Sequence, residues 1–293
     1  MLLKKAELVV KEIPWIASRS IAGFTNPGAI AFYRKMVTCG YEPDKLVNVL
    51  PHHKLIYVAV PKAASTRIRR TLARIEGRFS RSLKPSKRLQ YRGPYGPRNM
   101  TIGSFYNLAT SPATLRFSFV RNPYARVVSC WADKFASKPL TGGDPFIEAY
   151  LAARHEIDSG LPEGADCSLS FSDFVIFAAA AANARKDPHI QTQCDILKTP
   201  GINLDFIGKV ESFNTEFARV LDYLNASEEV RQEATIAVNE SLHDVWPTYY
   251  TRELADRIYR AYESDFDRFG YPRAQAPSRA KIKQATTTPW NSC

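Results

Sequence analysis

Three short apolar runs, each followed by a polar turn, stand out along the chain. They are LIYVAV after Lys54, FSFV after Arg116 and FIGKV after Asp205. All three are rich in β-branched and aromatic residues and are too short for a helix, which is typical of strands buried on both faces of a sheet. We therefore predict a strand at each of these positions.

Helical periodicity follows each predicted strand. Apolar residues recur at helical spacing over 65–75, Pro123 suits the first turn of a helix over 124–135, and an apolar stripe marks 214–224. A strand–helix unit that occurs three times predicts an α/β fold, with a P-loop-like parallel β-sheet flanked by helices. Ligands of such folds bind at the carboxyl ends of the strands, so the residues after each strand are the candidates for function.

Two more helices are predicted outside these units. Ser170 or Ser172 can cap an alanine-rich segment that suits packing. Thr251 can cap a C-terminal helix whose apolar face runs from Leu254 to Phe269, and Gly270 ends it.

Length and composition favour one large domain, because 293 residues with 45% hydrophobic content can bury a sizeable core. We expect an N-terminal extension over 1–44, a main domain over 45–272 and a disordered basic tail over 273–293. Charged residues interrupt the apolar positions of the N-terminal segment before they reach membrane-spanning length, so no stable membrane insertion is expected.

The net charge of +11 is concentrated in one part of the chain. Residues 45–131 contain 17 lysines and arginines and one acid, Glu76, a net of +16 that leaves the rest near −5. This charge surrounds strand-like runs and not a low-complexity arm, which indicates a folded anion site and argues against a nucleic-acid partner.

The five cysteines are odd in number and form no C-x-x-C pair. This pattern suggests neither a disulfide framework nor a zinc site, so a reducing, cytoplasmic location is expected.

The turn after the first strand reads Pro61-Lys-Ala-Ala-Ser-Thr66. Small residues at a helix start let backbone N–H groups approach an anion, and a lysine and two hydroxyls stand beside them. The glycines of a Walker A loop are absent. We interpret the turn as a phosphate cradle, with a surface lysine beside an ordinary capping serine as the alternative. The cradle residues are Lys62, Ala63, Ala64, Ser65 and Thr66.

The second strand ends in Arg121, and Ser129 follows about two turns along the next helix. A guanidinium fork and a hydroxyl suit a second phosphate. For Arg126 between them, a helix-surface cation and a functional role remain open.

These two motifs resemble those of sulfotransferases. The PKAAST turn looks like their 5′-phosphosulfate loop, and R-x-P-x-x-R-x-x-S from Arg121 to Ser129 looks like their 3′-phosphate segment. Downstream, DFIGKVESFNTEF and YRAYESDFDRFGY are similar to segments of the carbohydrate branch, sulfotransferase family 2, so that the resemblance covers roughly residues 52–272.

The resemblance implies the sulfotransferase fold and transfer of a sulfuryl group from 3′-phosphoadenosine 5′-phosphosulfate to a carbohydrate or glycolipid hydroxyl, without a metal. It assigns the 5′-phosphosulfate to Lys62 through Thr66 and the 3′-phosphate to Arg121 with Ser129. Many relatives are Golgi enzymes with an N-terminal membrane anchor, which is not visible here, and we therefore expect a cytoplasmic, bacterial-type form. The acceptor and the oligomeric state are not predicted.

A general base should take the proton of the acceptor hydroxyl. The leading candidate is His189, whose segment from Asp187 to Cys194 is similar to a histidine-containing stretch of the relatives; an ordinary loop histidine is the alternative. Glu211 is a second candidate. The remaining histidines rank lower: His52, His53, His155 and His243.

The basic segment 78–98, with Tyr91 and Tyr95, suits an acidic or sugar acceptor, or is a solvated loop. Three other functions stay open: a P-loop kinase, whose glycine-rich loop and acidic magnesium ligand are not found; a degenerate protein that binds the spent donor without turnover; and a polyanion-binding protein.

Overall fold

The computed structural model describes residues 26–38, 46–77, 96–136, 169–183, 187–236 and 245–273. The chain forms two compact units. The first contains Met1–Arg121 and Asp195–Glu240, and the second contains Asn122–Cys194 and Ser241–Cys293. Within the described ranges, no helix has the length and apolar character needed to span a membrane.

A mostly parallel sheet forms the centre of the first unit. Its described strands are β1 (Val47–Leu50), β2 (Leu55–Val58), β3 (Leu115–Val120) and β4 (Phe206–Lys209), in this spatial order. Strands β2, β3 and β4 run parallel, while β1 pairs antiparallel with β2. The predicted α/β class and the three predicted strands are thus confirmed.

Strand β1 was not predicted, because a polar residue interrupts its short apolar run. Asn48 is buried in this strand, and its side-chain amide donates to the carbonyls of Leu46 (3.0 Å) and Tyr57 (3.3 Å). These bonds satisfy the amide inside the core. The buried asparagine is thus compatible with a core strand because both of its amide hydrogens have acceptors.

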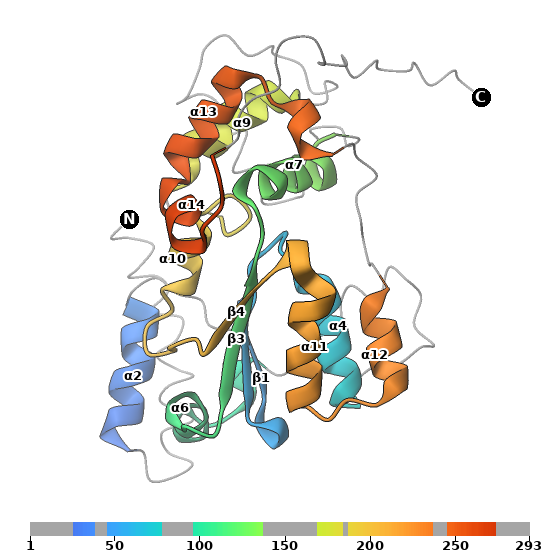
Figure 1. The fold of residues 1–293 in the computed structure, drawn as a ribbon. Coiled ribbons are helices and arrows are strands. Elements are labelled where there is room, and N and C mark those ends of the chain that lie inside the picture. Colours follow the sequence, from blue (N-terminus) through green and yellow to red (C-terminus); the bar gives the residue numbers. More distant parts are fainter. Residues whose placement is uncertain are drawn as a thin grey trace, which may run out of the picture. The chain divides into compact units, whose positions relative to one another are not determined.

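Helices cover both faces of this sheet (Figure 1). One face carries α4 (Ser65–Ile75), α11 (Phe213–Tyr223) and α12 (Glu228–Thr235), and the other carries α2 (Pro27–Thr38) and α6 (Ile102–Thr110). Short 3₁₀ turns complete the unit at Pro51–His53, Pro97–Asn99 and Val210–Ser212. Alternate strand residues such as Tyr57, Phe117 and Phe119 pack against the first of these helix layers.

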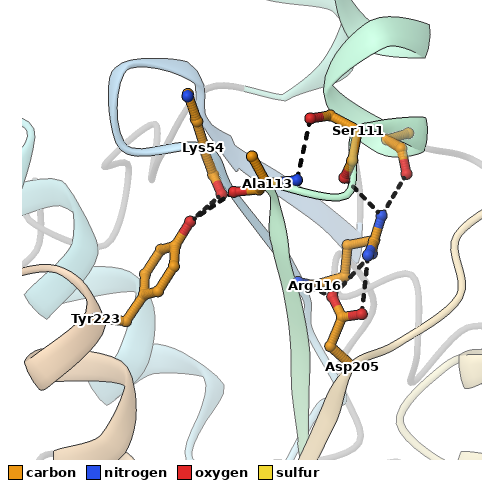
Figure 2. Close-up of polar contacts among 7 residues, drawn as sticks. Lys54, Ser111, Ala113, Arg116, Asp205 and Tyr223 are labelled. Carbon is orange, nitrogen blue, oxygen red and sulfur yellow. Dashed lines mark hydrogen bonds and ion pairs between the residues drawn. The ribbon is translucent and has the colours of Figure 1, made fainter.

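The amino ends of the parallel strands are tied together at one end of the sheet. Arg116 at the start of β3 forms a two-pronged ion pair with Asp205 just before β4, with a shortest distance of 2.8 Å. The Tyr223 hydroxyl, from α11, donates to the carbonyls of Lys54 (2.9 Å) and Ala113 (3.1 Å). Figure 2 shows both groups of contacts. The carboxyl ends of these strands lie at the opposite end of the sheet.

The second unit is helical around an aromatic core. It contains α7 (Pro123–Lys134), α9 (Phe171–Ala181), a 3₁₀ turn at Trp246–Tyr249, α13 (Arg252–Ala261) and α14 (Glu263–Phe269). Helix α10 (Gln193–Leu197) begins in this unit and ends in the first. Ser170 caps α9 by accepting the N–H of Asp173 (3.2 Å), which decides between the two predicted caps.

The predicted single C-terminal helix is wrong, since the segment divides into α13 and α14 at Tyr262. Thr251 does cap its start, as predicted. Tyr262 is completely buried, and its hydroxyl donates to the carbonyl of Ile190. In the next turn, buried Asp265 accepts the N–H of Gln193 (2.8 Å). These contacts with the loop before α10 accompany the change of direction that apolar spacing alone did not reveal.

Candidate active site

The turn that follows β2 has a strained backbone. Lys62 and Ala64 have φ angles of 67° and 57°, in the left-handed region, and α4 begins at the next residue. This region costs a residue with a side chain about 1–2 kcal/mol. Two such residues within one turn form the kind of backbone concavity that directs N–H groups at an anion.

The first turn of α4 directs backbone donors at this concavity. Its N-cap residue is Ala64, and no described side chain caps the helix. The first intrahelical bond runs from the N–H of Ile68 to the carbonyl of Ala64 (3.1 Å), so the amides of Ser65 and Thr66 lie ahead of it. The amide of Ala63 instead closes the turn by donating to the carbonyl of Val60 (3.2 Å).

The ends of the two sequence motifs meet in the first unit. Because β2 and β3 are parallel neighbours, the residues after each strand emerge at the same edge. The guanidinium of Arg121 donates to the backbone carbonyl of Lys62 (3.4 Å), and both side chains are half-buried. Within β3, the Ser118 hydroxyl donates to the carbonyl of Val58 at the end of β2 (2.6 Å) and so links the ends of the two strands.

Two arginines of α4 bind the neighbouring helices α11 and α12. Arg67 donates to the carbonyl of Ala234 (2.5 Å) and to the side chain of Asn214 (2.8 Å). Arg74 pairs with Glu229 (2.7 Å) and Glu233 (2.8 Å). Part of the basic excess of the segment therefore connects α4 to α11 and α12.

Helix α7 carries the second half of the Arg121–Ser129 motif. Asn122 caps it by accepting the N–H of Tyr124 (2.9 Å), and Ser129 is 8% exposed on the helix. Arg121 belongs to the first unit and Ser129 to the second. Their joint grip on one phosphate stays a prediction.

The interpretation of Arg126 as a helix-surface cation is wrong. Only 1% of this residue is exposed, and its guanidinium donates to the carbonyls of Gln191 (2.7 Å) and Pro188 (2.7 Å). The sequence placed Arg126 on the same side of the helix as Asn122 and Ser129, which does not distinguish a buried from an exposed guanidinium. What the sequence did not show is that a loop about 60 residues later supplies the carbonyls.

His189 is paired with a carboxylate in the second unit. Asp187 Oδ1 accepts the backbone N–H of His189 (2.7 Å) and lies 2.7 Å from the ring Nδ1. Burial raises the pKa of Asp187, but the hydrogen bonds and charge of His189 and the charge of Lys134 outweigh it, so that the pKa is lowered overall. The carboxylate is thus held in its ionised form beside the imidazole.

A protein-family model matches most of the chain. The model of the family described as "Sulfotransferase family" matches residues 45–272, most of the chain. The chain belongs to the sulfotransferase family.

The curated relatives of this sulfotransferase-family chain are distant but span much of it. Carbohydrate sulfotransferase 11 of Danio rerio is 23% identical over 245 residues, which are 79% of this chain and 67% of the relative. Carbohydrate sulfotransferase 12 of Mus musculus is 24% identical over 80% of this chain and 62% of its own length. The chain thus spans about two thirds of the length of these relatives. No solved structure matches it.

The remaining residues considered as general base or acceptor ligand are exposed, lie in turns, or fall outside the described residues. Glu211 is exposed in the 3₁₀ turn after β4. His52 and His53 occupy the 3₁₀ turn between β1 and β2 and are turn residues, as expected. Among the described residues, no three His, Cys, Asp or Glu side chains gather as a metal would require. Several predictions lie outside the described residues: His155, His243, Tyr91, Tyr95 and the tail over 274–293.

Proposed function

We propose that this protein transfers a sulfuryl group from 3′-phosphoadenosine 5′-phosphosulfate to a hydroxyl of a carbohydrate or glycoconjugate. Membership of the sulfotransferase family supports the reaction, and the names of the similar proteins, carbohydrate sulfotransferases 11 and 12, support the acceptor class. The expectations that no metal takes part and that the protein is cytoplasmic stay predictions.

The observation that carries the proposal is the contact of Arg121 with Lys62 at the start of α4. It joins the two motifs at the carboxyl edge of the parallel strands, where ligands of such folds bind. In the proposed complex, the amides of Ser65 and Thr66 and the positive end of α4 hold the 5′-phosphosulfate. Arg121 and Ser129 hold the 3′-phosphate.

Lys62 has the central part in the proposed chemistry. A lone pair of the acceptor oxygen forms the new O–S bond while the bond from sulfur to the bridging oxygen breaks. The bond electrons remain on the 5′-phosphate of the leaving adenosine 3′,5′-bisphosphate, and the acceptor proton passes to a base, for which we propose His189. The Lys62 ammonium stabilises the charge on the leaving oxygen, and contacts of this kind contribute about 2.7–4 kcal/mol to lowering the barrier.

Titration calorimetry with adenosine 3′,5′-bisphosphate tests the donor site. We expect binding that Lys62→Ala and Arg121→Ala each weaken at least about tenfold, since each removes a charged contact worth about 1.5–3 kcal/mol. The matched control is Arg70→Ala, which removes one positive charge from an exposed position of the same helix. If all three substitutions weaken binding equally, general basicity and not this site binds the nucleotide. No binding by folded wild-type protein would overturn the proposal.

Transfer of radiolabelled sulfate tests the reaction itself. The acceptor panel contains neutral glycosides and unsulfated polysaccharides with and without uronic acids. Label in a carbohydrate product that is lost in Lys62→Ala would support transfer. Tight nucleotide binding without label in any product would favour the degenerate binding protein, and magnesium-dependent phosphate transfer from ATP would favour the kinase.

A further inference from the structure

The loop that contains His189 is held by a buried arginine. Arg126 donates to the carbonyls of Pro188 and Gln191, at 2.7 Å each, on either side of the histidine. Burying a charged group is unfavourable unless hydrogen bonds satisfy it, and the loop carbonyls supply these bonds. The loop carbonyls therefore satisfy the buried guanidinium, and the guanidinium in turn holds the loop in place.

Further buried groups hold the same loop at other positions. The Tyr262 hydroxyl donates to the carbonyl of Ile190, and the N–H of Thr192 donates to the carbonyl of Ala182 (3.2 Å). Asp265 accepts the N–H groups of Gln193 (2.8 Å) and Cys194 (2.7 Å). The peptide groups around His189 thus have defined partners inside the second unit, unlike those of an ordinary surface loop.

The Asp187 carboxylate determines which ring nitrogen of His189 carries the proton. An ionised carboxylate only accepts hydrogen bonds, so Nδ1, at 2.7 Å, must be the protonated nitrogen. In the neutral ring Nε2 is then the proton acceptor. The His189 side chain is 31% exposed, so that a substrate can approach the ring.

Helix α7 carries both the arginine that holds this loop and a residue of the predicted 3′-phosphate segment. Arg126 and Ser129 are three residues apart and therefore neighbours on one side of the helix. The helix that presents a proposed 3′-phosphate ligand also holds the loop of the proposed base.

We propose that Arg126 and Asp187 are positioning residues for His189. Arg126 fixes the loop against α7, and Asp187 fixes the tautomer in which Nε2 takes the proton of the acceptor hydroxyl as the O–S bond forms. This inference rests on the proposed sulfuryl transfer for its chemical purpose, but its geometry is testable without substrate.

The tautomer is tested by ring-nitrogen NMR of the full chain, with the His189 signals assigned by their loss in His189→Gln. Wild-type protein should show the Nδ1–H form. Asp187→Ala removes the oxygen that accepts the Nδ1–H, so it should populate the Nε2–H form, and it should lower kcat at least about tenfold. The matched control Asp267→Ala, at an exposed position of α14, should change neither. An unchanged tautomer in Asp187→Ala would overturn the role of Asp187.

Hydrogen exchange of amides 187–194 tests the role of Arg126. Arg126→Lys keeps the charge but cannot reach both carbonyls in the same fork geometry, so these amides should exchange at least about tenfold faster. Tyr262→Phe, which removes one hydroxyl and keeps the ring, gives a second readout if the first variant folds poorly. Unchanged exchange in a folded Arg126→Lys variant would overturn the role of Arg126, and unchanged exchange in Tyr262→Phe would show that buried side chains do not hold the loop.

Nucleotide binding separates this inference from the proposed function. The Asp187 and Arg126 variants should bind adenosine 3′,5′-bisphosphate within about twofold of wild type. Their kcat should fall, because the loop acts on the acceptor proton and not on donor affinity. Wild-type protein that fails to bind the nucleotide would overturn the proposed function, whereas the tautomer and exchange results would still decide the positioning roles.

Discussion

Asp205 and Arg116 are joined by four hydrogen bonds. The carboxylate accepts the backbone N–H (2.8 Å), Nε (2.9 Å) and Nη2 (2.8 Å) of Arg116, and the N–H of Asp205 donates to the carbonyl of Arg116 (2.7 Å). Main chain and side chain thus bind the same partner, which sets the register in which β4 joins β3.

Asp205→Asn should therefore destabilise the protein. The variant keeps one acceptor oxygen but loses the charge, and because the carboxylate is 40% exposed we expect a loss of about 1–2 kcal/mol, below the value for a buried pair. Urea denaturation measures it. A double-mutant cycle with Arg116→Ala should give a coupling of at least about 0.5 kcal/mol, and additive losses would contradict the direct pairing.

The same pair predicts a dependence of stability on pH. Burial raises the pKa of Asp205, but the hydrogen bonds and charge of Arg116 lower it further, so the folded-state pKa lies below the unfolded value of about 3.9. The stabilisation is therefore present above that value and is lost as the pH falls through the lowered pKa. The difference in unfolding free energy between wild type and Asp205→Asn should shrink from about pH 6 to about pH 2, and a constant difference would argue against this linkage.

Substitutions at Ala64 should report the strain of the turn before α4. Because φ is 57° here, Ala64→Gly should raise the free energy of unfolding or leave it unchanged, whereas Ala64→Val should lower it by at least about 1 kcal/mol. Ala63→Gly is the matched control in the same turn, and it should be destabilising because the Ala63 methyl is buried. Thermal unfolding of the three variants measures these signs. Equal effects of glycine at both positions would contradict the assigned backbone strain.

Asp265→Asn should be strongly destabilising. The carboxylate is completely buried and accepts two backbone N–H groups, and an asparagine would turn its own N–H₂ toward one of them. Leaving that donor unsatisfied costs about 1–3 kcal/mol. Chemical denaturation should separate this variant from Asp267→Asn, at an exposed position of the same helix, which should resemble wild type.

The sequence was sufficient to predict the parallel strands and the helices that follow them. Strands β2, β3 and β4 each coincide with a short segment rich in apolar residues, and α4 begins directly after a turn of small residues. The proximity of Lys62 and Arg121 was also predictable, because the carboxyl ends of neighbouring parallel strands lie at the same end of a sheet. These features follow from sequence patterns within a few residues of each strand.

Features that depend on distant partners were not predictable. The helical pattern around Arg126 does not reveal its bonds to the carbonyls of Pro188 and Gln191. Likewise, Tyr262 fits the apolar face of one continuous helix, and the pattern does not reveal the bond from its hydroxyl to Ile190. Helices α2, α6 and α12 were also missed. In α12 the described core residues are only Val230 and Ala234, too few to make a clear stripe.

The interleaving of the two units has a consequence for the order in which the chain folds during synthesis. Strand β4 must pair with β3, yet all of Asn122–Cys194 is translated between the two parts of the first unit. Strand β4 begins 86 residues after the end of β3, so at about 5–20 residues per second the side of β3 that pairs with β4 waits about 4–17 s after leaving the ribosome before its partner emerges. An unpaired apolar edge is prone to aggregation during such an interval. Slower synthesis would lengthen this exposure, and a chaperone that covers the strand would shorten it.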